Sequence, residues 1–212
     1  MNLPPRKEPI DLILLCNGPG ELLTWVRPML KTLQKRLPQG RISLALNPCS
    51  HANGNEAEIA RTEFGLKRVL EPKNFFSFLF FAKTPENWSW HKKGLVLFLG
   101  GDQAFTWIIA KRLAYKSLIY AENQCRWSFL IDGFACQKKI PEINKKHRQK
   151  ARIVGDLTYE AISLTNSKLE SEWVSRKREP RKKQISLLPG SKPFKLKHCL
   201  PIFLGTVDQL LR

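Results

Sequence analysis

The sequence predicts an α/β fold in which a Rossmann-like parallel sheet is covered by flanking helices. Three observations predict it. An apolar run at 10–15 is followed by a glycine turn and then by apolar residues at helical spacing. Further apolar runs alternate with helical segments at the lengths of βαβ units. A second strand–glycine turn–helix unit begins near residue 185.

The first unit, at 10–37, contains the first candidate site. Its apolar run suits a strand buried on both faces, and Asn17-Gly18-Pro19-Gly20 follows at the carboxyl end, where doubly wound sheets bind ligands. Glu21 opens the predicted helix, where a carboxylate repels phosphate and favours a hydroxyl or a proton. We take Asn17, Gly18 and Gly20 as candidate substrate-binding residues and Glu21 as a candidate catalytic residue. The alternative is a purely structural turn with an ordinary first-turn charge.

The elements that follow are shorter. Strands are predicted at 41–46, 69–70, 94–99, 117–120, 134–136 and 151–154, and helices at 59–64, 104–115 and 159–173. Asp102 lies between the strand at 94–99 and its helix. It is our first choice for a catalytic base and Glu21 the second, because carboxylates at strand ends of one sheet could share a cleft. The alternative for Asp102 is a helix N-cap. Asn123 and Gln124, after another strand, are candidate substrate-binding residues.

An aromatic segment at 73–93 is flanked by lysines. It is too short to cross a bilayer, but it could lie at a membrane interface with its lysines on anionic lipid. The alternative is a buried helix that packs on the sheet. The candidate membrane-docking residues are Phe75, Phe76, Phe78, Phe80, Phe81, Trp88 and Trp90.

The composition predicts an anionic partner. Lys and Arg number 36 against 18 Asp and Glu, a formal charge of +18, which suits nucleic acid, an anionic membrane surface or phosphorylated substrates. Nucleic acid is the less favoured partner, since no RNP, zinc or helix-turn-helix pattern is present. Five scattered cysteines without a CxxC pair indicate reduced thiols in the cytoplasm and no metal site. No signal peptide or membrane span is evident, and no cofactor is expected.

The C-terminal part repeats the opening pattern. A basic linker at 176–184 separates a first domain, 1–175, from a second, 185–212, which has a predicted strand at 185–188, a turn at 189–193 and a helix at 196–211. Gly190, Ser191 and Lys192 in that turn are candidate phosphate-binding residues. A single βα unit cannot bury its apolar faces, so we expect an incomplete second domain and a chain that is inactive alone.

Four segments carry a family resemblance. The segment ISLLPGSKPFKLKHCLPIFL resembles the LPGSR segment that opens the second domain of lipid-A-disaccharide synthase, and IVGDLTYEAI, GPGE and GGDQAFTWIIAKRL are similar to its VGHPL, GE and DSPD regions. The resemblance implies a GT-B fold and inverting transfer from a UDP-sugar donor to a lipid-linked acceptor at the inner membrane face. The first domain would hold the acceptor and the second domain would hold the donor. The missing half of the second domain is a further expected partner. The alternatives are a basic nucleic-acid-binding module and a non-catalytic remnant of a glycosyltransferase.

Overall fold

The computed structural model describes residues 9–50, 52–164, 185–190 and 193–211. The chain divides into two compact units, 1–169 and 170–212, and each is described by itself. The predicted domain boundary at 175 and the basic linker at 176–184 lie outside the described residues.

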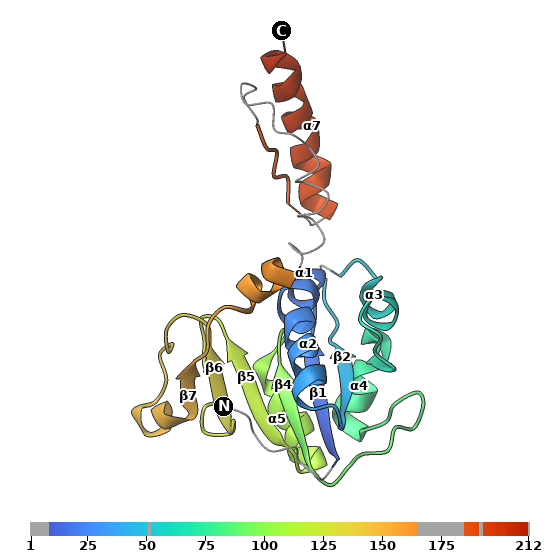
Figure 1. The fold of residues 1–212 in the computed structure, drawn as a ribbon, viewed down its shortest axis with the longest axis vertical. Helices are drawn as coiled ribbons and strands as arrows, with labels where there is room; N and C mark the ends of the chain where they lie inside the picture. The colour runs from blue at the N-terminus through green and yellow to red at the C-terminus, as the bar shows by residue number, and fades with distance from the viewer. Residues whose placement is uncertain (1–8, 51, 165–184, 191–192, 212) are drawn as a thin grey trace. The chain divides into compact units, whose positions relative to one another are not determined.

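The first unit contains a parallel sheet of seven strands in the order β3-β2-β1-β4-β5-β6-β7 (Figure 1). This confirms the predicted α/β, Rossmann-like class. The chain runs outward from β1 through β2 to β3, and then returns to place β4 on the other side of β1. The strands are β1 (Ile10–Cys16), β2 (Gly40–Leu46), β3 (Arg68–Leu70), β4 (Gly94–Phe98), β5 (Lys116–Ala121), β6 (Gly133–Cys136) and β7 (Ala151–Ile153).

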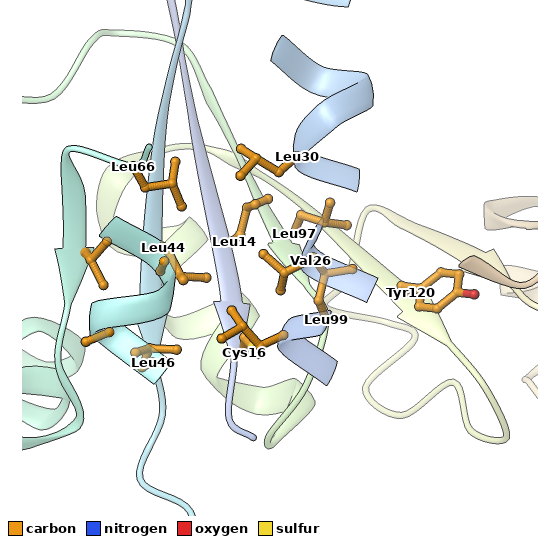
Figure 2. Close-up of a cluster of buried hydrophobic side chains, with 14 residues drawn as sticks. Leu14, Cys16, Val26, Leu30, Leu44, Leu46, Leu66, Leu97, Leu99 and Tyr120 are labelled. Carbon is orange, nitrogen blue, oxygen red and sulfur yellow. The ribbon is translucent and has the colours of Figure 1, made fainter. Parts of the chain in front are cut away.

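Helices cover both faces of the sheet because its central strands are apolar on both sides. Alternate residues of β1, such as Leu14 and Cys16, pack with Val26 and Leu30 of the helical segment that follows (Figure 2). On the other face, Ile13 and Leu15 belong to the cluster beneath α4 and α5. The helical segments are α1 (Pro19–Glu21), the π-helix η1 (Leu22–Val26), α2 (Arg27–Arg36), α3 (Glu56–Thr62), α4 (Pro72–Phe81), α5 (Gln103–Leu113) and the 3-10 helix η2 (Lys145–Lys150).

Some predicted elements differ in detail. The helix predicted after the first glycine turn is present, but it contains a π-helical stretch at 22–26 just before Pro28. Proline has no N–H to donate, so the regular hydrogen-bond ladder is interrupted there. The helix predicted at 159–173 begins two residues earlier, at 157, and is described as far as 164. Among the described residues, no helix is both long and apolar enough to span a membrane.

The second unit contains α7 (Pro193–Leu210), with Pro201 inside it. The strand predicted at 185–188 is wrong: 185–190 has no strand assignment, and residues 185–188 are exposed. A strand requires a neighbour to accept its backbone hydrogen bonds, and none of the described residues pairs with this segment. Gly190 does adopt a left-handed conformation, with φ of 86°, as expected of a glycine turn.

Candidate functional site

The candidate site lies at the carboxyl ends of β1, β2, β4 and β5. The chain winds from β1 through β2 to β3 and then crosses back to β4 on the other side of β1, so the winding direction reverses between β1 and β4, and a doubly wound sheet binds ligands at such a switch point. The register of the three central strands carries Asn47, Asn17 and Gly100 to the same level, one or two residues beyond the strands. The hydrogen bond from Asn47 N to Cys16 O, 2.7 Å, continues the β1–β2 pairing to this point.

Two adjoining pockets occupy this edge. The first, of about 360 Å³, is lined by residues that include Asn47, Asp102 and Arg126. The second, of about 350 Å³, is lined by residues that include Glu21, Glu122 and Asn123. Both pockets share five wall residues, so they form one continuous region of the surface: Asn17, Phe98, Gly101, Gln103 and Gln124.

Glu21 occupies space left by two glycines. A Cβ added at Gly18 would lie 2.7 Å from Glu21 Oε2, and one added at Gly100 would lie 3.3 Å from Glu21 Cγ. The first distance is shorter than real Cβ contacts and the second is tighter than most of them, so the absence of a Cβ after β1 and β4 leaves room for the carboxylate between the two strand ends. Gly20, in contrast, is exposed, and a Cβ there would meet no atom within 4 Å.

Asp102 is the N-cap of α5. Its Oδ1 accepts a hydrogen bond from Ala104 N at 2.9 Å, which confirms the capping interpretation. The residue is exposed and lines the first pocket, and Oδ2 takes no part in the cap. Capping and a catalytic role are compatible, because the cap uses a single oxygen.

Gln103 holds the rim of both pockets in place. Its Nε2 donates to Gln124 O at 2.9 Å, and its Oε1 accepts from Arg126 N at 2.8 Å. The first residue of α5 is thereby fixed to the loop that follows β5 by two hydrogen bonds. Such fixing reduces the entropy lost when a ligand is bound.

Two buried amide oxygens in the pocket wall have no hydrogen-bond partner among the described residues. They are Oδ1 of Asn17 and Oδ1 of Asn47. Asn47 is 1% exposed, and its Nδ2 donates to Gly100 O at 3.0 Å, which fixes the amide orientation. A Cβ at Gly101 would overlap that Nδ2, and φ of Gly101 is 104°, so only glycine fits beside the amide.

The structure brings most of the predicted site residues together. Asn17, Glu21, Asp102, Asn123 and Gln124 all line the two adjoining pockets, and Gly18 is buried beside Glu21. Of the predicted phosphate-binding residues, Gly190 is in the second unit. A Cβ added at Gly190 would lie 3.3 Å from the Lys195 side chain. Ser191 and Lys192 lie outside the described residues.

Sequence reasoning missed four wall residues that have charged or amide side chains. Asn47, Gln103, Glu122 and Arg126 also line the pockets. Each lies within about five residues of the end of a strand, which is the signal that could have identified them. The signal gives no preference among such residues, because strand order, and hence which strand ends meet, is not visible in the sequence.

The aromatic segment is divided between core and surface. Phe75 and Phe78 are buried, at 0% and 2% exposure, so their predicted role in membrane docking is wrong. They point to the sheet because residues three apart share a helix face. Trp88 and Trp90 are partly buried: both pack on this cluster and flank the Arg68 guanidinium, which lies 5.1 and 5.4 Å from their ring centroids, and their docking role stays a prediction. The exposed members are Phe76, Phe80 and Phe81.

Two buried cysteines of the first unit, Cys16 and Cys125, are poor nucleophiles. Burial raises the pKa of Cys16, beneath the first glycine turn, to about 12. Burial and the neighbouring Cys136 together raise the pKa of Cys125 to about 12. Both thiols are therefore neutral at physiological pH. In the part of the chain that is described, no group of three or more His, Cys, Asp or Glu side chains could hold a metal ion.

No family model and no curated protein matches the chain. Among solved structures, it is similar to the UDP-GlcNAc 2-epimerase of Neisseria meningitidis bound to UDP-GlcNAc, with 12% identity, a TM-score of 0.47, and coverage of 79% of this chain and 52% of that one. It is also similar to a ugt transferase from Siraitia grosvenorii in complex with UDP, with 12% identity, a TM-score of 0.32, and coverage of 54% and 28%. The chain thus spans about half the length of the first of these structures. Likeness at this level carries no argument about function.

Proposed function

We propose that this chain is the acceptor side of a GT-B-type glycosyltransferase that uses a UDP-sugar donor and a lipid-linked acceptor. The observation that carries the proposal is the gathering of carboxylates and amides at the switch point of the sheet. Glu21 and Glu122 line one pocket, and Asp102 lines the other. Such a wall suits a hydroxylated ligand, because carboxylates repel a diphosphate but accept hydrogen bonds and protons from hydroxyl groups.

The chemistry requires one base on this side. A carboxylate, Asp102 or Glu21, takes the proton of the acceptor hydroxyl as its oxygen forms a bond to the anomeric carbon of the donor. The bond from that carbon to the diphosphate oxygen breaks, and UDP leaves with the electron pair. Attack from the face opposite to the leaving group inverts the anomeric centre. General-base catalysis of this kind contributes typically 10²–10⁴-fold in rate.

The donor diphosphate would be bound by the other unit. Gly190, Ser191 and Lys192 are the residues that we assign to it, on the resemblance to the LPGSR segment of lipid-A-disaccharide synthase. A turn that carries cations next to a helix N-terminus is chemically suited to stabilise a departing diphosphate. Lipid A as the product remains part of this proposal.

The lipid-linked acceptor would be reached through α4. Phe76, Phe80 and Phe81 are 50%, 53% and 71% exposed, and their rings contact one another in sequence, with centroid distances of 6.1 and 6.4 Å. Exposed Lys73 and Lys83 lie just before and after them. Exposed aromatic side chains beside lysines are typical of surfaces that lie on anionic lipid.

Acceptor binding tests the proposal directly. A lipid-linked N-acylglucosamine phosphate in detergent micelles, titrated into the ¹⁵N-labelled chain, should shift the backbone amides of Asn17, Gly101 and Gln124. In a protein that carries the whole second domain and turns over a UDP-sugar, Asp102→Asn and Glu21→Gln identify the base, since the correct variant lowers kcat about 100-fold or more and leaves acceptor binding intact. Acceptor that shifts none of these amides would refute the acceptor-side assignment.

Vesicle binding tests the membrane part. The variant with Phe76, Phe80 and Phe81 changed to serine should lose sedimentation with phosphatidylglycerol vesicles. Phe129→Ser is the matched control, because it removes an aromatic side chain that is 64% exposed on a different segment. Equal loss in both variants would argue against docking through α4.

The rival function is nucleic-acid binding. It is favoured by the formal charge of +18 and by the basic segment at 138–152. An RNA oligonucleotide that binds with a steep salt dependence and shifts amides in that segment, while the lipid-linked sugar does not bind, would favour this rival.

A further inference from the structure

The two orphaned amide oxygens of the pocket wall point to a ligand that the residue types alone did not define. Resting on the proposed function, we propose that Asn17 and Asn47 form a subsite for a neutral, hydroxyl-rich ring, and that their Oδ1 atoms accept hydrogen bonds from its hydroxyl or amide N–H groups. The subsite is the first pocket, of about 360 Å³, beside Gly101 and Asp102.

The positions of the two asparagines follow from the sheet. Cys16 pairs with Leu46, so Asn17 and Asn47 are neighbours one residue beyond the ends of β1 and β2. Residues paired in register have side chains on the same face of the sheet. Two amides are therefore presented side by side, and the glycines that follow β4 leave room for both, since a Cβ at Gly100 would lie 2.7 Å from Asn17 Oδ1.

The orientation of Asn47 is fixed by its own hydrogen bond. Nδ2 donates to Gly100 O at 3.0 Å, so Oδ1 cannot exchange places with it without losing that bond. A buried amide oxygen without a donor destabilises a folded protein, and most buried polar atoms have a partner. Of the five such atoms among the described residues, these two line one pocket, whereas those of Ser43, Arg68 and Thr106 line neither pocket of the site, so a ligand bound here is a source of donors for both amides.

The chemistry of the wall selects the ligand class. The orphaned atoms and the carboxylate of Asp102 are acceptors that repel a phosphate placed against them, and the charge of Asp102 is balanced by Arg126, the other charged residue of the wall, so the wall as a whole is neutral. A cationic ligand is disfavoured by the formal charge of +18 on the chain. The first pocket by itself is near the lower end of ligand-site volumes, which suits one sugar ring, and the adjoining second pocket leaves room for the rest of a larger acceptor. A neutral monosaccharide unit satisfies all three conditions.

The experiment compares sugar binding with fold stability in matched variants of the full chain. Asn17→Leu removes Oδ1 with little change in shape, and Thr106→Val removes another buried orphan oxygen, on α5, that does not line the pocket. N-acetylglucosamine and glucose are the probes, inorganic phosphate and UDP are the anionic comparison, and binding is followed by the ¹H–¹⁵N signals of Gly101 and of the Asn47 side-chain amide.

The proposal expects the neutral sugars, and not phosphate or UDP, to shift these signals. It expects Asn17→Leu to weaken sugar binding about 10-fold while the melting temperature is unchanged or raised, and Thr106→Val to leave binding unchanged. Asn47→Leu, checked by circular dichroism for folding, should weaken binding similarly. Sugar binding that is unaffected by both asparagine variants, or a site that prefers phosphate, would overturn the proposal.

The same data separate this inference from the proposed function. Sugar binding that depends on Asn17, with no binding of a lipid-linked acceptor, would refute the transferase assignment and support the subsite. Binding of the lipid-linked acceptor that is unaffected by both asparagine variants would refute the subsite and leave the transferase assignment in place.

Discussion

Asp11 lies at the opposite end of β1 from the candidate site, and its surroundings allow a quantitative prediction. The side chain is fully buried, and its carboxylate accepts four hydrogen bonds. Arg41 donates through Nε at 2.6 Å and Nη2 at 2.9 Å, the Tyr115 hydroxyl at 2.7 Å and the His91 backbone N–H at 2.6 Å. The network joins β1 to β2, to the end of α5 and to the segment before β4.

Asp11→Asn should cost about 3 kcal/mol of unfolding free energy. Removing one charge of a buried ion pair costs typically about 3–5 kcal/mol, because the partner is left uncompensated. The lower end applies here, since the Arg41 side chain is 28% exposed and can be hydrated again. At about 2–4 °C per kcal/mol for a chain of this size, the melting temperature should fall by roughly 6–12 °C. Tyr115→Phe, which removes one of four hydrogen bonds, should cost about 1 kcal/mol.

The effect should depend on pH in a defined direction. Burial by itself raises the pKa of Asp11, but the hydrogen bonds from Arg41, Tyr115 and His91 together outweigh it and hold the pKa below its usual value. A carboxyl group whose pKa is lower in the folded state stabilises the fold above its unfolded pKa, near 4, and loses that contribution as pH falls through the folded pKa. The difference between Asp11→Asn and the parent should therefore be largest at neutral pH and shrink below about pH 4.

Thermal unfolding followed by circular dichroism, at pH 7 and at pH 3, measures both effects. A melting temperature within 2 °C of the parent at pH 7, or a loss of the same size at both pH values, would contradict the reasoning. Sugar binding serves as a control, because a strand of seven residues separates Asp11 from the site by about 20 Å. Folded Asp11→Asn protein should bind as the parent does.

Two further predictions concern the site itself. Gly101→Ala should destabilise the fold by at least about 1–2 kcal/mol and abolish sugar binding, because φ is 104° and the new Cβ would overlap Asn47. Gly20→Ala is the control, since a Cβ there would meet no atom within 4 Å. Equal losses of stability and of sugar binding in the two variants would contradict this prediction. Gln103→Ala should free the loop that follows β5, because it removes the acceptor of the Arg126 backbone N–H, Gln103 Oε1. That N–H should then exchange with deuterium about 10-fold faster, and unchanged protection from exchange would contradict the prediction.

Much of the fold could be predicted from local sequence. The run from Leu12 to Leu15 is apolar on both faces, and the structure buries all four residues in the middle of a parallel sheet. Strand ends followed by glycine turns also located the edge that carries Glu21 and Asp102. These predictions succeed because burial on both faces and the left-handed conformation of glycine are properties of a few neighbouring residues.

Asn47 could not be identified in this way. As a residue that ends a strand just before a proline, it resembles an ordinary turn residue. Its position beside Asn17 depends on β2 pairing with β1 rather than with another strand, and that pairing is decided by the whole sheet. The predicted strand at 185–188 failed for the same reason, since local apolar character cannot supply a neighbouring strand.

The aromatic segment shows a different limit. When the segment from Phe75 to Phe81 is treated as one apolar run, all of its residues are assigned together, either to the core or to a membrane interface. In the helix that forms, residues at i, i+3 and i+4 share a face, so Phe75, Phe78 and Leu79 are buried while Phe76, Phe80 and Phe81 are exposed. Helical spacing applied within the run would have separated the two groups.

The buried polar groups at the two ends of β1 differ in whether they have hydrogen-bond partners. At the amino end, the carboxylate of Asp11 has four donors, so its burial is compensated within the chain. At the carboxyl end, the Oδ1 atoms of Asn17 and Asn47 have no partner among the described residues. An unpartnered buried acceptor costs about 1–3 kcal/mol, so two of them consume a large share of the about 5–15 kcal/mol by which native proteins are stable. Other buried polar atoms among the described residues, those of Ser43, Arg68 and Thr106, also lack a partner, but the two amide oxygens are the pair that lines one pocket. A ligand that brings two donors to this pocket recovers their cost on association.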